Sequence, residues 1–257
     1  MQDFFANCAT VLQKYGFSYL RGAGTTLLLA LVGTFFGCLI GFAVGALQTI
    51  PIDKQRDPVW KRVLLKILHI FLRCYVELFR GTPMIVQAVF IYYGLLQVFG
   101  IKMGMWQAGF FIVSINTGAY MAEIVRGGII SIDKGQFEGA MSIGMTHSQT
   151  MLKVIIPQVM RNILPSVSNE FVINIKDTSV LNVIGVTELY YFAGIIKRQS
   201  FETFQTYLVV CVIYFILTFT VTRLLRWVER KLDGNDSYVI FGSQSDSAAE
   251  IRISREA

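Results

Sequence analysis

Two sets of polar side chains stand at helical spacing inside long apolar segments of this 257-residue sequence. They are Asn116, Tyr120 and Glu123, and Glu170, Asn174 and Asp177. Each set follows the pattern i, i+4, i+7, which places its members on one face of a helix. Amide and carboxylate oxygens on such a face could replace part of the water shell of a zwitterionic or cationic solute. Ionisable groups inside a membrane usually face protein or water, so both stripes predict a solute pathway.

The alternative is that these residues serve packing and gating. Glu123 could pair with Arg126, and Glu77 with Arg80, which would make the carboxylates structural. Lys176 and Asp177 are adjacent, so their side chains diverge by about 100° on a helix and pairing between them cannot be assumed.

No arrangement of residues predicts catalysis, metal binding or a cofactor held by this chain. The sequence has no Gly-x-x-x-x-Gly-Lys-Ser/Thr phosphate loop and no His-Glu-x-x-His motif. Its two histidines, His69 and His147, lie far apart, and no cysteines stand at redox or metal spacing. We therefore expect any nucleotide chemistry to reside on another subunit.

A third pattern lies in a polar segment between two apolar ones. Glu138, Gly139 and Ala140 are followed by three residues, Gly144, nine residues, and then Val154-Ile155-Ile156-Pro157. We expect two short helices over 135–145 and 146–156, with a positive-φ turn at Gly144. Thr146 or Ser148 is expected to cap the second helix, and Pro157 to end it or open the next element. Glu138, near the expected start of the first helix, is suited to meet the helix dipole or a basic group on a partner.

Composition identifies a membrane protein with several spans. The chain is 54% hydrophobic and only 16% charged, with a mean hydropathy of +0.54. The net charge of +6 does not indicate nucleic-acid binding, because the basic residues stand beside apolar segments. Five transmembrane helices of an all-α protein are predicted, over 22–52, 81–101, 103–122, 163–187 and 203–222.

Several residues are expected to shape these spans. Glycines recur every fourth residue at Gly33, Gly37, Gly41 and Gly45, which allows close approach of another helix. Pro83 predicts a break after the segment 67–77, which either forms one kinked element with the second span or approaches the membrane at a shallow angle. Arg80, close to this break, is interpreted as architectural.

Charge asymmetry predicts the orientation. Basic residues crowd the connections 53–66, 126–161 and 223–231, which places these connections in the cytoplasm. We therefore expect an extracytoplasmic N-terminal segment over 1–21, a transmembrane domain over 22–231 with a cytoplasmic loop at 128–160, and a cytoplasmic tail over 233–257, in part disordered.

The loop spacing resembles the coupling loop of bacterial ABC importer permeases, whose form is Glu-Ala-Ala, three residues, Gly, nine residues, then Ile-any-Leu-Pro. Gly139 departs from that form and is expected to loosen its helix by about 1 kcal/mol relative to Ala. Three further stretches, YVELFRGTPMIVQAVFIYYG from 75, AYMAEIVRGGIISIDKGQ from 119 and NEFVINIKDTSVLNVIGVTEL from 169, are similar to permeases of polar amino-acid ABC importers of the histidine/glutamine/arginine type.

The resemblance implies a type I importer permease in the bacterial cytoplasmic membrane. Its implied partners are a second permease subunit, favoured as a homodimer, two ABC ATPase subunits that bind ATP and Mg, and an extracytoplasmic amino-acid-binding protein. The coupling residues implied by the motif are Glu138, Gly139, Ala140, Gly144, Met145 and Pro157. Two other functions stay open: a membrane anchor or scaffold without its own pathway, and an ion-driven secondary transporter.

Overall fold

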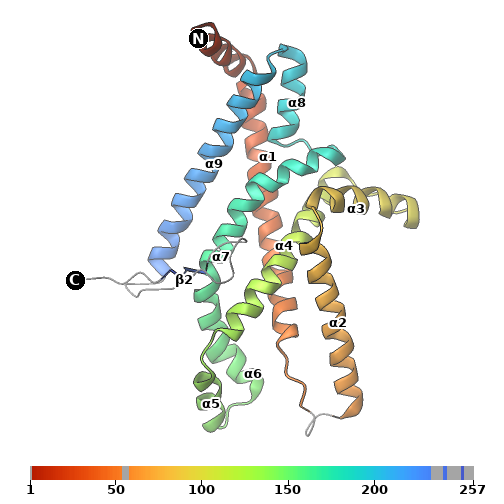
Figure 1. Ribbon diagram of the computed structural model, residues 1–257, viewed down its shortest axis with the longest axis vertical. Coiled ribbons are helices and arrows are strands. Elements are labelled where there is room, and N and C mark those ends of the chain that lie inside the picture. Colours follow the sequence, from red (N-terminus) through yellow and green to blue (C-terminus); the bar gives the residue numbers. More distant parts are fainter. Residues whose placement is uncertain (1, 54–57, 233–239, 242–249, 252–257) are drawn as a thin grey trace, which may run out of the picture. The chain divides into compact units, whose positions relative to one another are not determined.

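The computed structural model describes residues 2–53, 58–232, 240–241 and 250–251. Its helices are α1 (Gln2–Gln48), α2 (Val59–Gly81), α3 (Met84–Phe99), α4 (Met105–Ile130), α5 (Lys134–Ser142), α6 (His147–Thr150), η1 (Met151–Ile155), α7 (Ile156–Asp177), η2 (Thr178–Ile184), α8 (Leu189–Ser200) and α9 (Thr203–Leu232) (Figure 1). Most of the expected tail lies outside the described residues. In the described part of the tail, two short strands, β1 (Ile240–Phe241) and β2 (Glu250–Ile251), pair antiparallel.

Three helices of the described residues are long and apolar enough to cross a membrane: Ala6–Gln48, Met105–Ile130 and Thr203–Lys231. Two further helix pairs pass the same test together but are bent at a short break, Val59–Gly81 with Met84–Phe99 and His147–Ile184 with Leu189–Ser200. The structure therefore offers three spans, or up to five if each bent pair counts as one. An all-helical membrane fold is confirmed, whereas the count of five remains a prediction.

Helix α1 begins well before the first expected span. Residues from Gln2 onward are helical and continue without a break into the apolar segment that follows Gly22. No Pro interrupts the sequence in this range, and Gly22 lies within the helix. Consequently the expected boundary between 1–21 and the membrane domain does not coincide with a break in secondary structure.

The break between α2 and α3 is set by Pro83. This residue occupies the N-cap position of α3, with φ −64° and ψ 136°. A proline disfavours the helical region for the residue before it, so α2 ends at Gly81 and Thr82 links the two helices. The structure has two helices bent by 115° at this break, which is compatible with both forms that the sequence left open.

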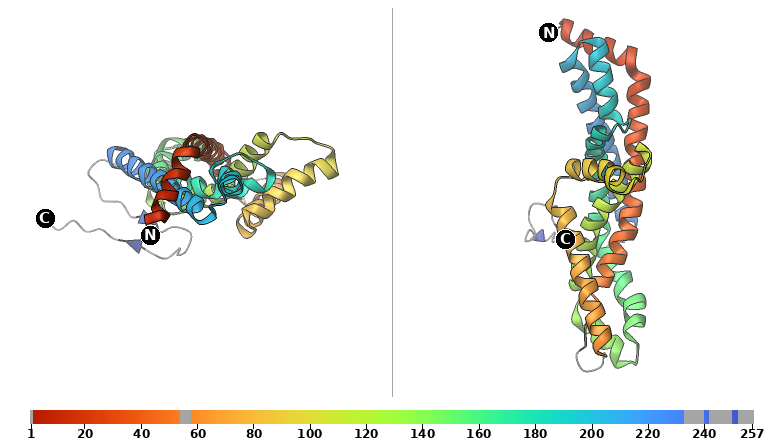
Figure 2. Two further views of the ribbon diagram at one scale, coloured as in Figure 1. Left: turned by 90° about the horizontal axis from the view of Figure 1, so that it is seen from above. Right: turned by 90° about the vertical axis from the view of Figure 1, so that its right-hand side faces the viewer.

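The chain divides into two compact units. Unit 1 comprises residues 1–36, 82–116 and 171–223, and unit 2 comprises 37–81, 117–170 and 224–257. In unit 1, the first part of α1 packs with α8 and α9 through Tyr19, Leu189, Ala193 and Val210, and these three helices lie side by side (Figures 1 and 2). A second cluster in unit 1 includes Leu29.

Unit 2 is built around the second half of α4. Val125 and Ile129 pack with Ile155 and Val159, which joins α4 to the segment that follows α6. Ala122, on another side of α4, packs with Val44, Leu72 and Val76 from α1 and α2. Helix α4 therefore fixes the positions of its neighbours in this unit.

The glycine row of α1 lies against α4 in both units. In unit 1, a Cβ added at Gly33 would lie 2.2 Å from Val113 Cγ1. In unit 2, a Cβ at Gly41 would lie 2.2 Å from Met121 Cβ and 2.8 Å from its carbonyl carbon. Gly37 and Gly45 have contacts of the same kind with residues of α4. These approaches bring the helix backbones too close for any larger side chain at Gly41.

Candidate functional site

The segment that carries the coupling motif forms a helical hairpin in unit 2. Asp133 caps the N-terminus of α5, because its carboxylate accepts a hydrogen bond from the Gly135 amide at 2.6 Å. Helix α5 then runs to Ser142, and α6 starts at His147, so the two helices are joined by a short turn (Figure 1). This arrangement agrees with the two short helices expected on either side of Gly144.

The turn is a Schellman motif with Gly144 at the left-handed position. Gly144 has φ +83°; its amide donates to the Met141 carbonyl at 3.0 Å. The Met145 amide donates to the Ala140 carbonyl at 3.2 Å, which completes the pair of hydrogen bonds that defines this helix end. A residue with a Cβ is disfavoured at this φ, which explains why the pattern places a glycine there.

Thr146 starts the second arm with a capping box. Its hydroxyl accepts from the Gln149 amide at 3.3 Å, and the Gln149 side chain accepts from the Thr146 amide at 2.9 Å. Of the two caps that the sequence allowed, Thr146 is therefore the one used.

The second arm is not a separate helix that ends at Pro157. Helix α6 passes into the π-helical segment η1 and then into α7, where Pro157 is the second residue. A proline has no amide hydrogen and its ring clashes with the carbonyl four residues earlier, here that of Lys153, so the preceding turn widens. The expected boundary at 156 is thus replaced by a continuous helical path out of the hairpin.

The six residues of the motif differ in exposure. Ala140 is buried and Met145 half-buried, whereas Glu138, Gly139, Gly144 and Pro157 are exposed. Glu138 is the fifth residue of α5, so it stands at mid-helix rather than near the start, and Asp133 is the residue that meets the N-terminal dipole. The motif therefore offers an exposed surface on a helix whose other side is anchored in unit 2.

Large apolar side chains surround the turn of the hairpin. Ile143 is 78% exposed and Leu152 67%, and Met141 is also exposed. Phe137 and Met151, on either side of the turn, pack on the cluster that contains Ile129 and Ile155. An exposed apolar surface on a rigidly held hairpin is suited to bind another protein.

Polar residues of α4 make contacts in each unit. In unit 1, the buried Asn116 donates to Gln87 Oε1 at 2.8 Å, and Gln87 donates to the Thr82 hydroxyl at 2.8 Å. In unit 2, the Arg80 guanidinium lies 5.7 Å from the centroid of the Tyr120 ring. Gln87, which was not among the predicted site residues, supplies the hydrogen-bond acceptor for the side-chain amide of Asn116.

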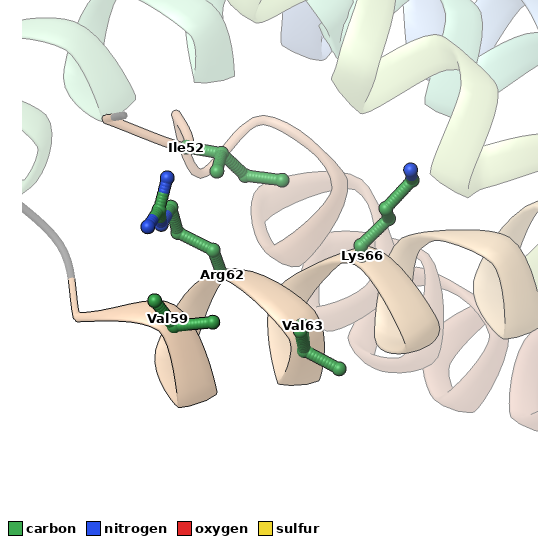
Figure 3. Close-up of a pocket in the computed structure, with 5 residues that line it drawn as sticks. All are labelled: Ile52, Val59, Arg62, Val63 and Lys66. Carbon is green, nitrogen blue, oxygen red and sulfur yellow. The ribbon is translucent and has the colours of Figure 1, made fainter. Parts of the chain in front are cut away.

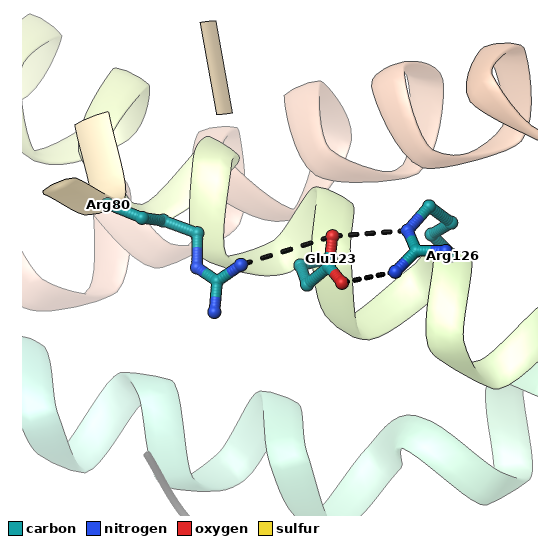
Figure 4. Close-up of polar contacts among 3 residues, drawn as sticks. All are labelled: Arg80, Glu123 and Arg126. Atoms are coloured by element: carbon teal, nitrogen blue, oxygen red, sulfur yellow. Dashed lines mark hydrogen bonds and ion pairs between the residues drawn. The ribbon is translucent and has the colours of Figure 1, made fainter. Parts of the chain in front are cut away.

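Glu123 is the centre of a group of charges in unit 2 (Figure 4). Arg126 Nε donates to Glu123 Oε2 at 3.1 Å, and the Arg126 Nη2 atom forms an ion pair with Oε1. Arg80 Nη1 lies 3.9 Å from Glu123 Oε2. The expected ion pair of Glu123 with Arg126 is present. Arg80, for which the sequence suggested Glu77 as a partner, approaches Glu123 instead.

The α7 stripe is divided between buried and exposed positions. Glu170 and Asn174 are only 5% and 3% exposed, and Asn174 donates to the Thr34 hydroxyl at 2.8 Å. Asp177 is the last residue of α7 and is exposed. The stripe therefore has two buried polar side chains, Glu170 and Asn174, and one exposed carboxylate, Asp177.

Glu188 is a buried carboxylate that was not among the predicted site residues. It is fully buried in unit 1 and caps α8, accepting from the amides of Tyr190 and Tyr191 at 2.8 and 2.6 Å. The Tyr214 hydroxyl also donates to it, at 2.9 Å. The three donors, two of them amides in the first turn of α8, make Glu188 a structural cap. Among the described residues, no group of three or more His, Cys, Asp or Glu side chains could hold a metal ion.

Comparisons with known proteins agree with this architecture. Residues 60–234 match the family described as binding-protein-dependent transport system inner membrane component. The chain is 36% identical to a probable amino-acid ABC transporter permease protein, PatM, from Vibrio harveyi, over 86% of this chain and 93% of that one. It is 34% identical to the glutamine transport system permease protein GlnP of Escherichia coli K12, over 83% and 92%.

Solved structures give the same result for the fold. A crystal structure of an amino acid ABC transporter with histidines shares 36% identity with this chain, with a TM-score of 0.75, over 86% of this chain and 96% of that one. An inward-facing MetNI methionine ABC transporter, at 19% identity and a TM-score of 0.62, matches in fold over 84% and 98%. With the matched region covering most of the sequence, this chain belongs to the family of binding-protein-dependent transport system inner membrane components, as an amino-acid ABC transporter permease.

Proposed function

We propose that the α5–α6 hairpin is the contact through which a separate ATPase drives this permease. The observation that carries the proposal is the exposed apolar surface of Ile143 and Leu152 around a turn fixed by Gly144. A nucleotide-driven movement can shift a helix bundle only through a firm contact, and the continuous path from α6 through η1 into α7 supplies one. The proposed coupling residues are Glu138, Gly139, Ala140, Gly144, Met145 and Pro157.

The proposed pathway carries polar or basic amino acids past the α4 and α7 stripes. Its residues are Asn116, Tyr120, Glu123, Glu170, Asn174 and Asp177. Glu123 and Asp177 are the carboxylates accessible to a solute, since neither is fully buried. The exposed carboxylate of Asp177 favours a solute with a net positive charge or an exposed ammonium group, whereas the charge of Glu123 is offset by Arg126 and Arg80. The names of the relatives, which include glutamine and arginine permeases, agree with this class of solute.

The proposed assembly has two copies of this chain, two ATPase subunits that bind ATP and Mg, and an extracytoplasmic binding protein. Each chain has five spans, with its N-terminus outside, residues 128–160 in the cytoplasm and the tail 233–257 on the same side. The basic connections at 53–66, 126–161 and 223–231 support this orientation. The bacterial cytoplasmic membrane is the expected location.

The test is uptake by vesicles that contain the purified assembly, with ATP on the ATPase side and amino acids loaded on the binding protein. Glu138→Lys should abolish ATP-driven uptake while leaving membrane insertion intact. Gln136→Lys, which places a cation on the opposite side of α5, should retain most of the uptake. Normal uptake with Glu138→Lys would refute the coupling role.

The same vesicles separate this proposal from its two alternatives. A scaffold subunit without a pathway would support no uptake that depends on Glu123 or Asp177. An ion-driven secondary transporter would take up solute without ATP, provided an ion gradient is present. Uptake that requires both ATP and the binding protein supports the importer.

A further inference from the structure

A pocket lies in unit 2 where the chain passes from α1 to α2. It has a volume of about 320 Å³ and is lined by Ile52, Val59, Arg62, Val63 and Lys66 (Figure 3). Three of these residues are apolar and two are cations. Arg62 and Lys66 are four residues apart, so they project from the same side of α2. The pocket thus combines two positive charges with an apolar wall.

The position of this pocket is at the end of a membrane span. Helix α1 is a candidate span as far as Gln48, and Ile52 follows it by four residues. Trp60, next to the pocket on α2, is strongly exposed. Tryptophan is enriched at the level of lipid headgroups, so the exposed Trp60 favours a position of this pocket near the membrane–water interface.

The apolar wall continues along α2 beyond the pocket. Val63 is 51% exposed and Ile67 61%, and Ile70 is exposed on the same face. The opposite side of the helix packs inside unit 2 through Leu72 and Val76. An anion held by Arg62 and Lys66 would therefore have an apolar surface beside it that an alkyl chain could cover.

Charge favours an anion on this connection. Residues 53–66 hold five basic and two acidic side chains, for a net charge of +3. A free phosphate would use the two cations of the pocket but leave Val59, Val63 and Ile67 uncovered. Only an amphipathic anion satisfies both parts of the surface, and the membrane supplies one in its anionic phospholipids.

We propose that Ile52, Val59, Arg62, Val63 and Lys66 form a binding site for one anionic phospholipid. The lipid phosphate lies between Arg62 and Lys66, and an acyl chain follows the exposed apolar face of α2 past Ile67. This site depends on the membrane location of the chain and not on its role in coupling or on the solute that it carries.

The experiment is native mass spectrometry of the full chain, purified in detergent with the subunits that copurify, after addition of phosphatidylglycerol. The wild-type protein should retain one phosphatidylglycerol and no phosphatidylcholine. Arg62→Gln/Lys66→Gln should lower the retained fraction by roughly tenfold or more, because each basic residue contributes a separate attraction to the lipid. Val63→Ser, which keeps both cations, should also lower retention.

Two controls make the result specific. Arg226→Gln/Arg230→Gln removes the same charge from another exposed basic pair four residues apart, on α9, and should leave retention unchanged. Excess inorganic phosphate should not displace the lipid. Equal losses with both double variants, or displacement by phosphate alone, would overturn the proposal, as would equal retention of phosphatidylcholine. All variants must elute as the folded assembly on size exclusion.

Discussion

Gly144 is the residue on which the shape of the hairpin depends. At φ +83°, a side chain with a Cβ is strained by about 1–2 kcal/mol, and a β-branched one by more. Gly144→Val should therefore disrupt the Schellman turn and misplace Ile143 and Leu152. We expect loss of ATP-driven uptake with unchanged membrane insertion, measured by vesicle transport and by the amount of protein in the membrane fraction.

Gly139 offers a matched control in the same hairpin. It lies within α5, and a Cβ added there would meet nothing within 4 Å. Gly139→Ala restores the alanine that the family form has at this position, so it should preserve uptake, and it should stabilise α5 by about 1 kcal/mol because Ala is the better helix former. If both glycine substitutions lower uptake equally, the effect does not come from the positive φ of Gly144.

Glu123 determines how the charged side chains of unit 2 are arranged. Its replacement by Gln would weaken the contacts with Arg126 and Arg80 by about 1 kcal/mol, allowing for the partial exposure of these groups. Uptake of a basic amino acid should then fall about fivefold, more than uptake of a neutral one. The measurement is the initial uptake rate for arginine and for glutamine with their binding proteins.

Glu77→Gln serves as the control for charge alone. Glu77 is an exposed carboxylate on α2 that makes no ion pair with Arg80 in the part of the chain that the structure describes. Its substitution should leave both uptake rates within about twofold, the range expected for an exposed surface change. An equal loss with Glu77→Gln would remove the reason to single out Glu123.

The packing of α1 on α4 is the clearest prediction at the level of elements. A Cβ at Gly41 would clash with the backbone of Met121, which cannot rotate away as a side chain end could. Gly41→Ala should therefore destabilise the protein by about 1–3 kcal/mol, as overpacking does. Gly24→Ala, also in α1 but with nothing within 4 Å, should be neutral or stabilising. Thermal unfolding in detergent measures both, and equal melting temperatures would contradict the packing argument.

The sequence predicts those elements whose signal is local. The turn at Gly144, the cap at Thr146 and the break at Pro83 each follow from the conformational preference of one residue or one short motif. The close approach of α1 and α4 follows from the four-residue period of the glycines. Apolar length likewise indicates where helices can cross the membrane.

Other features depend on residues far apart in the chain and could not be predicted. The partner of Asn116 is Gln87, 29 residues away, and the buried Glu188 accepts a hydrogen bond from Tyr214, 26 residues away. The π-helical turn before Pro157 is one of several ways in which a helix accommodates a proline. The middle position of Glu138 in α5 follows from the cap at Asp133, which the motif does not include.

At the scale of the whole molecule, the number of spans determines which side of the membrane holds the hairpin. If both bent helix pairs cross, the chain has five spans, and α5 and α6 lie on the same side as the C-terminus. If both pairs enter and leave on one side, three spans remain, and the hairpin lies opposite the C-terminus. Coupling to a cytoplasmic ATPase is possible only if the hairpin lies on the cytoplasmic side of the membrane.

Two single-cysteine variants determine on which side of the membrane the hairpin lies. After replacement of Cys8, Cys38, Cys74 and Cys211, Lys102→Cys places one exposed thiol before α4, and Lys134→Cys places one after it, at the first residue of α5. Helix α4 crosses the membrane in both topologies, so the two thiols always react from opposite sides. With five spans and the N-terminus outside, a membrane-impermeant maleimide should label position 102 in intact cells and label position 134 only after the membrane is opened. The reverse pattern would mean that the basic connections do not mark the cytoplasmic side, and that the hairpin cannot reach an ATPase there.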